Sequence, residues 1–214
     1  MKQSKLIHQI IIATTTNKQD DVIVKEAEQL KVLCFRGDEE DVLSRYYTAA
    51  KENNADIVVR ITSDCTLIDS EITDKIIRFY LDNGIYNLVT NAGPFAQNRT
   101  FPRGLDTEVF SFDILKEAFD DATEKYQREH VTPFIYENTE RYKIYYIYAE
   151  GKLKRPEIRI TLDTEQDFKL LSKIINHFKN IDFKTEDVID FLDENPELLK
   201  INRHVKQKSV MGVR

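Results

Sequence analysis

Hydrophobic and polar positions along residues 1–92 follow two alternating patterns. Short runs rich in β-branched residues are typical of buried strands, and they lie at 6–15, 31–35, 55–62 and 86–92. Between these runs, apolar residues recur at helical spacing, over 18–30, 40–54 and 69–84. This alternation predicts strands that run parallel and are joined by helical crossovers, as in an α/β doubly wound sheet.

The predicted strands of this first part end in polar turns. Three of these turns read "ATTTN", "FRGDEED" and "TSDCT". In doubly wound sheets, ligands bind outside the carboxyl ends of the strands. We therefore expect the chemistry of this chain at that edge, with Asp64 in the third turn as its first candidate carboxylate.

The pattern changes after Ala92. Residues 93–104 form a turn-rich loop, of the kind that is often functional. Beyond the loop, strands are expected at 105–112, 142–150 and 157–163, and helices at 113–122, 128–140, 164–178 and 184–200, the last of them broken by Pro196. We interpret residues 1–214 as a single domain.

Composition narrows the class of protein without identifying it. The 214 residues are 41% hydrophobic and 32% charged, with a formal net charge of −6, which is ordinary for a globular protein and argues weakly against a nucleic-acid partner. No apolar run is long enough to span a membrane, and the start lacks the features of a signal peptide, so we expect a cytoplasmic protein without membrane contact. Cys34 and Cys65 are interpreted as reduced core thiols.

Two carboxylates follow predicted strands that are far apart in the chain. Asp64 and Asp163 each come after a β-branched run and before a helix. Two such acids at one sheet edge could share Mg²⁺, which prefers oxygen ligands and keeps sites for substrate phosphates. The alternative is that Asp163 or Thr164 only caps the following helix.

A second group of polar residues lies around the central loop. Asp106 and Glu108 are two residues apart and face the same side of a strand, where two acids are costly unless they meet cations or hydroxyl donors. The hydroxyl groups of a sugar would satisfy them, whereas a solvated strand face is the plainer alternative. His130, in "REHVTP", has charged neighbours, although a lone histidine is more often structural.

Several stretches together resemble the cytidylyltransferase family, and in particular its SpsF-like branch of spore coat polysaccharide biosynthesis. They are "IIIATTTN", "FRGDEEDVLSRYY", "VVRITSDCTLID", "FPRGLDTEVFS", "REHVTPFIYEN", "RITLDTEQDF" and "NPELLKINRHVKQKS". They span nearly the whole chain in order. The resemblance implies a Rossmann-like, GT-A-like three-layer sandwich with a mainly parallel sheet, and transfer of CMP from CTP to a sugar, which could be acidic.

The resemblance also assigns roles to residues and regions. It implies that Asp64 and Asp163 are catalytic and hold Mg²⁺, and that residues 1–92 form a nucleotide half, 93–180 a sugar-binding half and 181–214 a helical tail. Homodimerisation is left open. The residues implied on the nucleotide side are Thr14, Asp41, Arg45 and Arg60; those implied on the sugar side are Arg103, Gly104, Asp106, Glu108 and His130.

The chain departs from the family pattern at two places. Ser63 and Thr66 stand where the family usually has glycine and proline, and a Cβ at position 63 could restrict the approach of a phosphate. Family members also begin with a strand and a basic, glycine-containing loop that binds the triphosphate, whereas the first glycine of this chain is Gly37. We therefore expect a sheet without its first strand, and weak CTP binding or none.

Three functions remain open from the sequence. The first is a cytidylyltransferase, which predicts Mg²⁺-dependent release of pyrophosphate from CTP. The second is a non-catalytic remnant that binds a sugar or a partner, which predicts sugar binding without turnover. The third is a glycosyltransferase, which ranks last because "SDC" offers one acid where such enzymes usually have a pair.

Overall fold

The computed structural model describes residues 1–92, 99–179 and 182–207. The strands in this part of the chain are β1 (Ile11–Thr15), β2 (Leu33–Gly37), β3 (Ile57–Arg60), β4 (Leu88–Thr90), β5 (Glu108–Ser111) and β6 (Ile144–Tyr146). The α-helices are α1 (Asp21–Leu30), α2 (Val42–Glu52), α3 (Ser70–Asp82), α4 (Phe112–Asp121), α5 (Lys125–His130), α6 (Pro133–Glu137), α7 (Glu165–Phe178) and α8 (Thr185–Glu194). Short 3₁₀ turns lie at Lys18–Asp20, Gly151–Leu153 and Leu198–Lys200.

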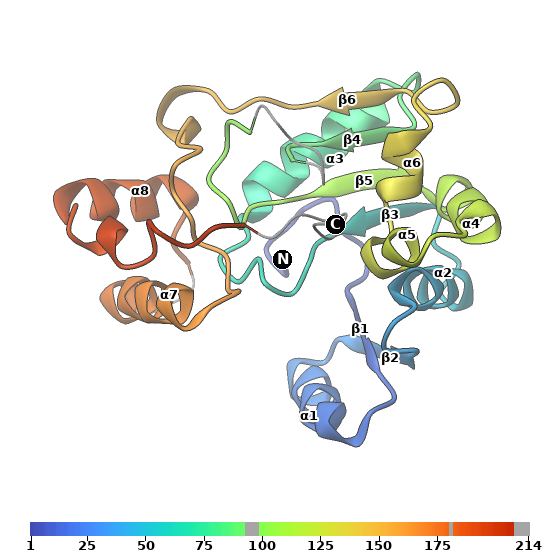
Figure 1. Ribbon diagram of the computed structural model, residues 1–214, viewed down its shortest axis with the longest axis horizontal. Helices are drawn as coiled ribbons and strands as arrows, with labels where there is room; N and C mark the ends of the chain where they lie inside the picture. The colour runs from blue at the N-terminus through green and yellow to red at the C-terminus, as the bar shows by residue number, and fades with distance from the viewer. Residues whose placement is uncertain (93–98, 180–181, 208–214) are drawn as a thin grey trace.

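The strands form two sheets. β1 and β2 pair in parallel, and a second sheet has the order β3-β5-β4-β6 (Figure 1). In the larger sheet β3, β4 and β6 share one direction, while β5 is antiparallel to both of its neighbours. The mainly parallel α/β fold is thus confirmed, with β5 as the exception. No helix interrupts the described part of the connection from β4 to β5, and a parallel pair would have needed such a crossover.

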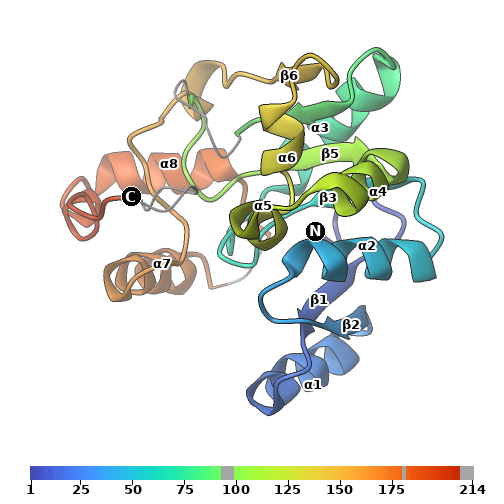
Figure 2. The same cartoon turned by 45° about the vertical axis from the view of Figure 1, so that its right-hand side comes forward.

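Helices cover both faces of the larger sheet. Val89 and Val109 pack with α3 in one hydrophobic cluster, and their neighbours Leu88 and Phe110 pack with α2 and α4 in another. This switch from one residue to the next follows from the period of two along a strand. The three-layer arrangement is therefore confirmed for this part of the chain. Figure 2 shows α5 and α6 near the α2 and α4 side of this sheet, while α1 lies against β1 and β2.

Several expected elements differ in extent or kind. The strand expected at 6–15 begins only at Ile11. The prediction of a strand at 157–163 is wrong, because an isolated bridge between Arg159 and Arg103 is its one ladder contact within the part of the chain that the structure describes. The helix expected at 128–140 is split into α5 and α6. Pro133 has no N–H to continue a helical ladder, and it stands at the start of α6 instead of inside one helix.

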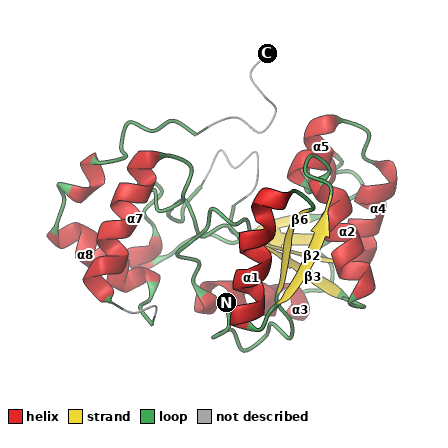
Figure 3. Cartoon of the chain, turned by 90° about the horizontal axis from the view of Figure 1, so that it is seen from below, coloured by secondary structure: helices red, strands yellow, loops and turns green. Residues whose placement is uncertain are grey.

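Helices α7 and α8 lie together, away from the strands (Figure 3). Each follows its predicted pattern, with Thr164 as the N-cap of α7 and a 3₁₀ turn after Pro196. Their apolar faces join the cluster that also contains α3. The expected division into halves at residues 92 and 180 is not tested by these contacts.

Candidate active site

Asp64 and the residues before Asp163 are in direct contact, although 97 residues separate Asp64 from Thr161. The hydroxyl of Thr161 donates to Oδ2 of Asp64 at 2.8 Å, and the amide of Leu162 donates to the Asp64 carbonyl at 3.0 Å. Asp64 reaches this position through a turn after β3, in which the amide of Thr66 donates to its carbonyl. The two predicted carboxylates therefore lie on segments that are hydrogen-bonded to each other.

Asp163 belongs to an ionic cluster centred on Arg159. One guanidinium nitrogen of Arg159 contacts Asp163 at 2.5 Å and Asp167 at 2.9 Å. Thr164, and not Asp163, is the N-cap of α7, so helix capping does not account for Asp163. Burial by itself raises the pKa of Asp167, but hydrogen bonds from Arg159, Asn202 and the start of α7 outweigh it and lower this pKa to about 2.

The loop before β5 adds a second group of charges. Arg99 binds Asp106 through two contacts of 2.6 Å. Arg103 has no ion pair among the described residues, and burial together with the neighbouring Arg99 lowers its pKa. Gly104 has a φ of +104°, and a Cβ there would meet the carbonyl oxygen of Ile160 at 2.6 Å. This close approach explains the glycine and places Arg103 beside the segment that leads to Asp163.

Glu108 lies at the centre of a buried polar network. Its carboxylate accepts hydrogen bonds from Arg60 at 2.5 Å, Thr132 at 3.0 Å and Tyr136 at 2.8 Å. Burial alone lowers the pKa of Arg60, but the Glu108 carboxylate outweighs this effect and raises it. The argument that Asp106 and Glu108 need a sugar is therefore wrong, because the protein itself supplies their partners. Their assignment to the sugar side stays a prediction.

The residues assigned to the nucleotide side lie mostly around β1 and α2. The hydroxyl of Thr14 donates to Asp20, and Asp41 caps α2 through the amide of Ser44. Arg45 reaches across to the carbonyl of Ala13 on β1 at 3.4 Å, and its Nε is buried without a hydrogen-bond partner among the described atoms. Arg60 is the exception, since its ion pair with Glu108 places it in the other sheet.

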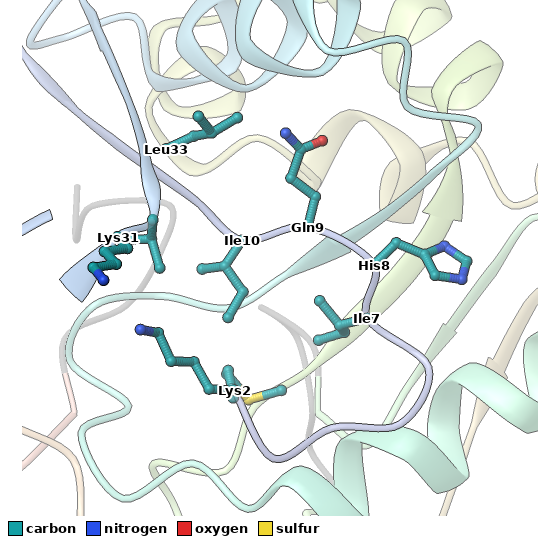
Figure 4. Close-up of a pocket in the computed structure, with 9 residues that line it drawn as sticks. Lys2, Ile7, His8, Gln9, Ile10, Lys31 and Leu33 are labelled. Atoms are coloured by element: carbon teal, nitrogen blue, oxygen red, sulfur yellow. The ribbon is translucent and has the colours of Figure 1, made fainter. Parts of the chain in front are cut away.

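A roomier cavity lies at the other end of β1 and β2. It measures about 540 Å³ and is lined where these strands begin, by residues that include Ile10, Lys31 and Leu33 (Figure 4). None of the predicted site residues lines it. A smaller cavity of about 200 Å³ does include Arg103 and Arg159. Neither Asp64 nor Asp163 lines this cavity, but Arg159, which does, is paired with Asp163. We therefore place the candidate site at the smaller cavity together with the Asp64 turn and the Asp163 segment.

The carboxylate oxygens of Asp64 and Asp163 are of the kind that Mg²⁺ prefers, but they are few. The described residues contain no group of three or more His, Cys, Asp or Glu side chains placed to hold a metal ion. Two carboxylates, Asp64 and Asp163, are nevertheless a sufficient protein contribution for Mg²⁺, which completes its shell with water and substrate phosphates. Arg159 competes for Asp163, so a cation would share that carboxylate with a guanidinium.

Sequence reasoning found the acids and missed their partners. Thr161, Arg99 and Arg159 hold Asp64, Asp106 and Asp163 in place, yet none was singled out. Thr161 could have been suspected from its spacing of two from Asp163 along an extended segment. Arg159 carried a similar cue, since it precedes Asp163 by four residues.

Comparison with known proteins decides the family. The family described as Cytidylyltransferase matches residues 1–207. The chain belongs to the cytidylyltransferase family. The described helices include none that is long and apolar enough to cross a membrane.

Two curated proteins are similar in sequence to this cytidylyltransferase-family chain. An uncharacterised protein of Methanocaldococcus jannaschii is 44% identical over 213 residues, which cover 100% of this chain and 84% of the relative. The spore coat polysaccharide biosynthesis protein SpsF of Bacillus subtilis is 26% identical over 191 residues, covering 88% and 76%.

Two solved structures resemble the fold. A cytidylyltransferase from Leptospira borgpetersenii has a TM-score of 0.87 at 35% identity and covers 96% of this chain and 84% of its own. A CMP:2-keto-3-deoxy-manno-octonic acid synthetase complexed with CTP has a TM-score of 0.56 at 11% identity, with 83% of each chain covered, and shows likeness of fold alone. These likenesses do not support the expectation that the first strand is missing.

Proposed function

We propose that this chain transfers CMP from CTP to a sugar for surface or spore coat polysaccharide. A sugar hydroxyl oxygen forms a bond to the α-phosphorus of CTP, and the bond from that phosphorus to the bridging oxygen breaks. Pyrophosphate leaves with the electron pair, and the hydroxyl proton passes to water. The observation that carries the proposal is the contact of Asp64 with Thr161 and Leu162, which joins the two acidic segments at one site.

The residues of the chain would contribute mainly by positioning and charge. Asp64 and Asp163 would hold Mg²⁺, which supplies neutralisation of phosphate charge when bound. The Thr161 hydroxyl fixes the Asp64 carboxylate from one side. Such positioning and preorganised charge account for most of the catalysis in phosphoryl-type transfers.

Arg103 supports an acidic sugar as the substrate. It lies among Arg99, Arg159, Asp106 and Asp163, and it is the guanidinium of this group that has no ion pair among the described residues. A ligand carboxylate would supply the missing charge in bidentate fashion. The distant structural neighbour is named for such a sugar acid.

The decisive experiment measures pyrophosphate released from CTP and Mg²⁺ with a panel of sugar acids and neutral sugars. We expect release with at least one sugar acid, and a loss of at least about a hundredfold in Asp64→Asn. Asp113→Asn changes an exposed carboxylate in the first turn of α4 and is the matched control, expected to retain full activity. Equal rates for wild type and Asp64→Asn would contradict the proposal.

The open sheet edges favour a second candidate, a non-catalytic sugar-binding or partner-binding member of the family. β3 ends its sheet and β1 is not paired with it, so among the described strands an edge of each is unpaired. The turn after β1 also has no glycine to approach a phosphate closely. This second candidate predicts that the chain binds CTP weakly.

Calorimetric titration separates the two candidates. Low-micromolar binding of CTP with Mg²⁺ would contradict the non-catalytic candidate. Sugar binding without nucleotide binding would favour it. Homodimerisation and a cytoplasmic location stay predictions.

A further inference from the structure

Val131, between α5 and α6, has a backbone conformation that its residue type strongly disfavours. Its φ is +73° and its ψ is −56°, and the amide of Thr132 donates to the carbonyl of His130 at 2.9 Å. These features define a γ-turn of the positive-φ kind, which is rare and strained. A β-branched residue makes the strain larger, and glycine would adopt the same φ at no steric cost.

The surroundings of the turn hold it in this conformation. The Val131 side chain is fully buried in the hydrophobic cluster that also contains α2 and α4. The Thr132 hydroxyl donates to Glu108 at 3.0 Å, and Glu108 is paired with Arg60 at the end of β3. The turn is therefore connected by two polar contacts to the strand that leads into the Asp64 turn.

The segment on the other side of the turn is also held against the first part of the chain. Arg128 of α5 forms an ion pair of 2.7 Å with Asp41, the N-cap of α2. An unstrained turn would be enough to join two short helices. The Thr132–Glu108 and Arg128–Asp41 contacts are therefore not needed for that purpose alone. Strained backbone that the surrounding structure over-determines is found preferentially at functional sites.

We propose that Thr132 is a positioning residue for the sugar side of the site. Its bond to Glu108 fixes the strained turn, and the turn sets the place of the adjacent His130 relative to the Asp64 turn. This inference rests on the proposed function, and it takes His130 as one of the residues that the family resemblance implies on the sugar side. It adds that sugar affinity depends on a hydroxyl that does not itself contact the sugar.

The test compares isosteric changes of two buried threonines. Thr132→Val removes the hydroxyl that reaches Glu108, and Thr132→Ser retains it. Thr73→Val is the matched control, since Thr73 is equally buried and its hydroxyl donates to the carbonyl of Asp69, the N-cap of α3, and lies 3.4 Å from the hydroxyl of Thr107. Each variant is assayed by pyrophosphate release for kcat and for the KM values of sugar and CTP, and by thermal unfolding.

We expect Thr132→Val to raise the KM for the sugar at least about tenfold, with kcat and the KM for CTP within about threefold of wild type. Thr132→Ser should restore the wild-type KM. Thr73→Val should lower the thermal midpoint without changing any KM. An unchanged sugar KM in Thr132→Val, or an equal rise in Thr73→Val, would overturn the proposal.

A second measurement needs no activity and separates this inference from the proposed function. The ring-proton resonances of the four histidines are compared by NMR in the absence of substrate. We expect the His130 resonance to move in Thr132→Val and to stay in place in Thr132→Ser and Thr73→Val. If wild type releases no pyrophosphate with any sugar, the proposed function fails, and an unmoved His130 resonance then overturns the positioning role as well.

Discussion

The buried pair of Arg60 and Glu108 yields a prediction whose size follows from the structure. The side chains are 15% and 5% exposed, so both charges are largely removed from water. Glu108→Gln keeps the shape of the side chain and an oxygen that can accept from Thr132 and Tyr136, but it removes the negative charge. Arg60 is then left as a buried cation without a counter-ion.

We expect Glu108→Gln to lower the free energy of unfolding by about 3–5 kcal/mol, the usual cost of leaving one partner of a buried pair uncompensated. Arg60→Met should cost less, because two hydroxyl donors still stabilise the Glu108 carboxylate. The double variant should be less destabilised than the sum of the two, by about 1–3 kcal/mol, since no unpaired charge remains.

Urea unfolding followed by circular dichroism measures these free energies, with the slope against denaturant checked for constancy. Asp120→Asn is the surface control, because the Lys116–Asp120 pair is about half exposed on both sides and its loss should leave the unfolding midpoint unchanged. The reasoning is refuted if Glu108→Gln costs less than about 1 kcal/mol, or if the two single effects simply add.

Two further predictions concern the acidic segment. Because the pKa of Asp167 is lowered to about 2, against about 3.9 in an unfolded chain, its carboxylate should contribute roughly 2–3 kcal/mol at neutral pH. That contribution is present above the unfolded pKa and is lost as pH falls from about 4 toward 2. The free energy of unfolding, measured with urea across this range, should therefore fall less steeply with decreasing pH in Asp167→Asn than in wild type. Identical pH dependences would disprove the assignment. Gly104→Ala should cost at least about 1–2 kcal/mol from its positive φ alone, with an added clash at Ile160, so an unchanged thermal midpoint would contradict the described backbone.

Local patterns predicted most helices and most strands well, because those patterns report burial directly. The helix over α3 begins after Asp69 as expected, and the Asp69 carboxylate accepts from the amides of Glu71 and Ile72. The strand predicted at 157–163 was wrong because a local pattern reports burial and not pairing. It alternates and carries β-branched residues, but a ladder needs a neighbouring strand in register, and here one contact with Arg103 is all that the described chain provides.

For the candidate site, too, the sequence predicted positions along the chain but not contacts between distant segments. The carboxyl-end rule predicted Asp64 in the turn after a strand, and the structure has it in the turn after β3. Its role in the site stays a prediction. The rule could not tell which groups would meet each acid. The partner of Glu108 is 48 residues away and that of Asp106 only seven, and both are arginines that sequence spacing alone does not connect to a strand face.

The internal pairing of these acids also changes how a ligand would bind. If Asp106 and Glu108 were unpaired, a sugar would be bound by acceptors and the site would favour neutral hydroxyl groups. With both acids paired to arginines, the Arg103 guanidinium, a donor, is the charged group of this cluster that has no ion pair among the described residues. If Asp64 and Asp163 bind Mg²⁺ as proposed, a site with a donor cation beside them gains most from a substrate that carries its own anion, because that anion replaces the water which Arg103 loses on burial. The shift from expected acceptors to an observed donor is therefore the strongest physical reason to test sugar acids before neutral sugars.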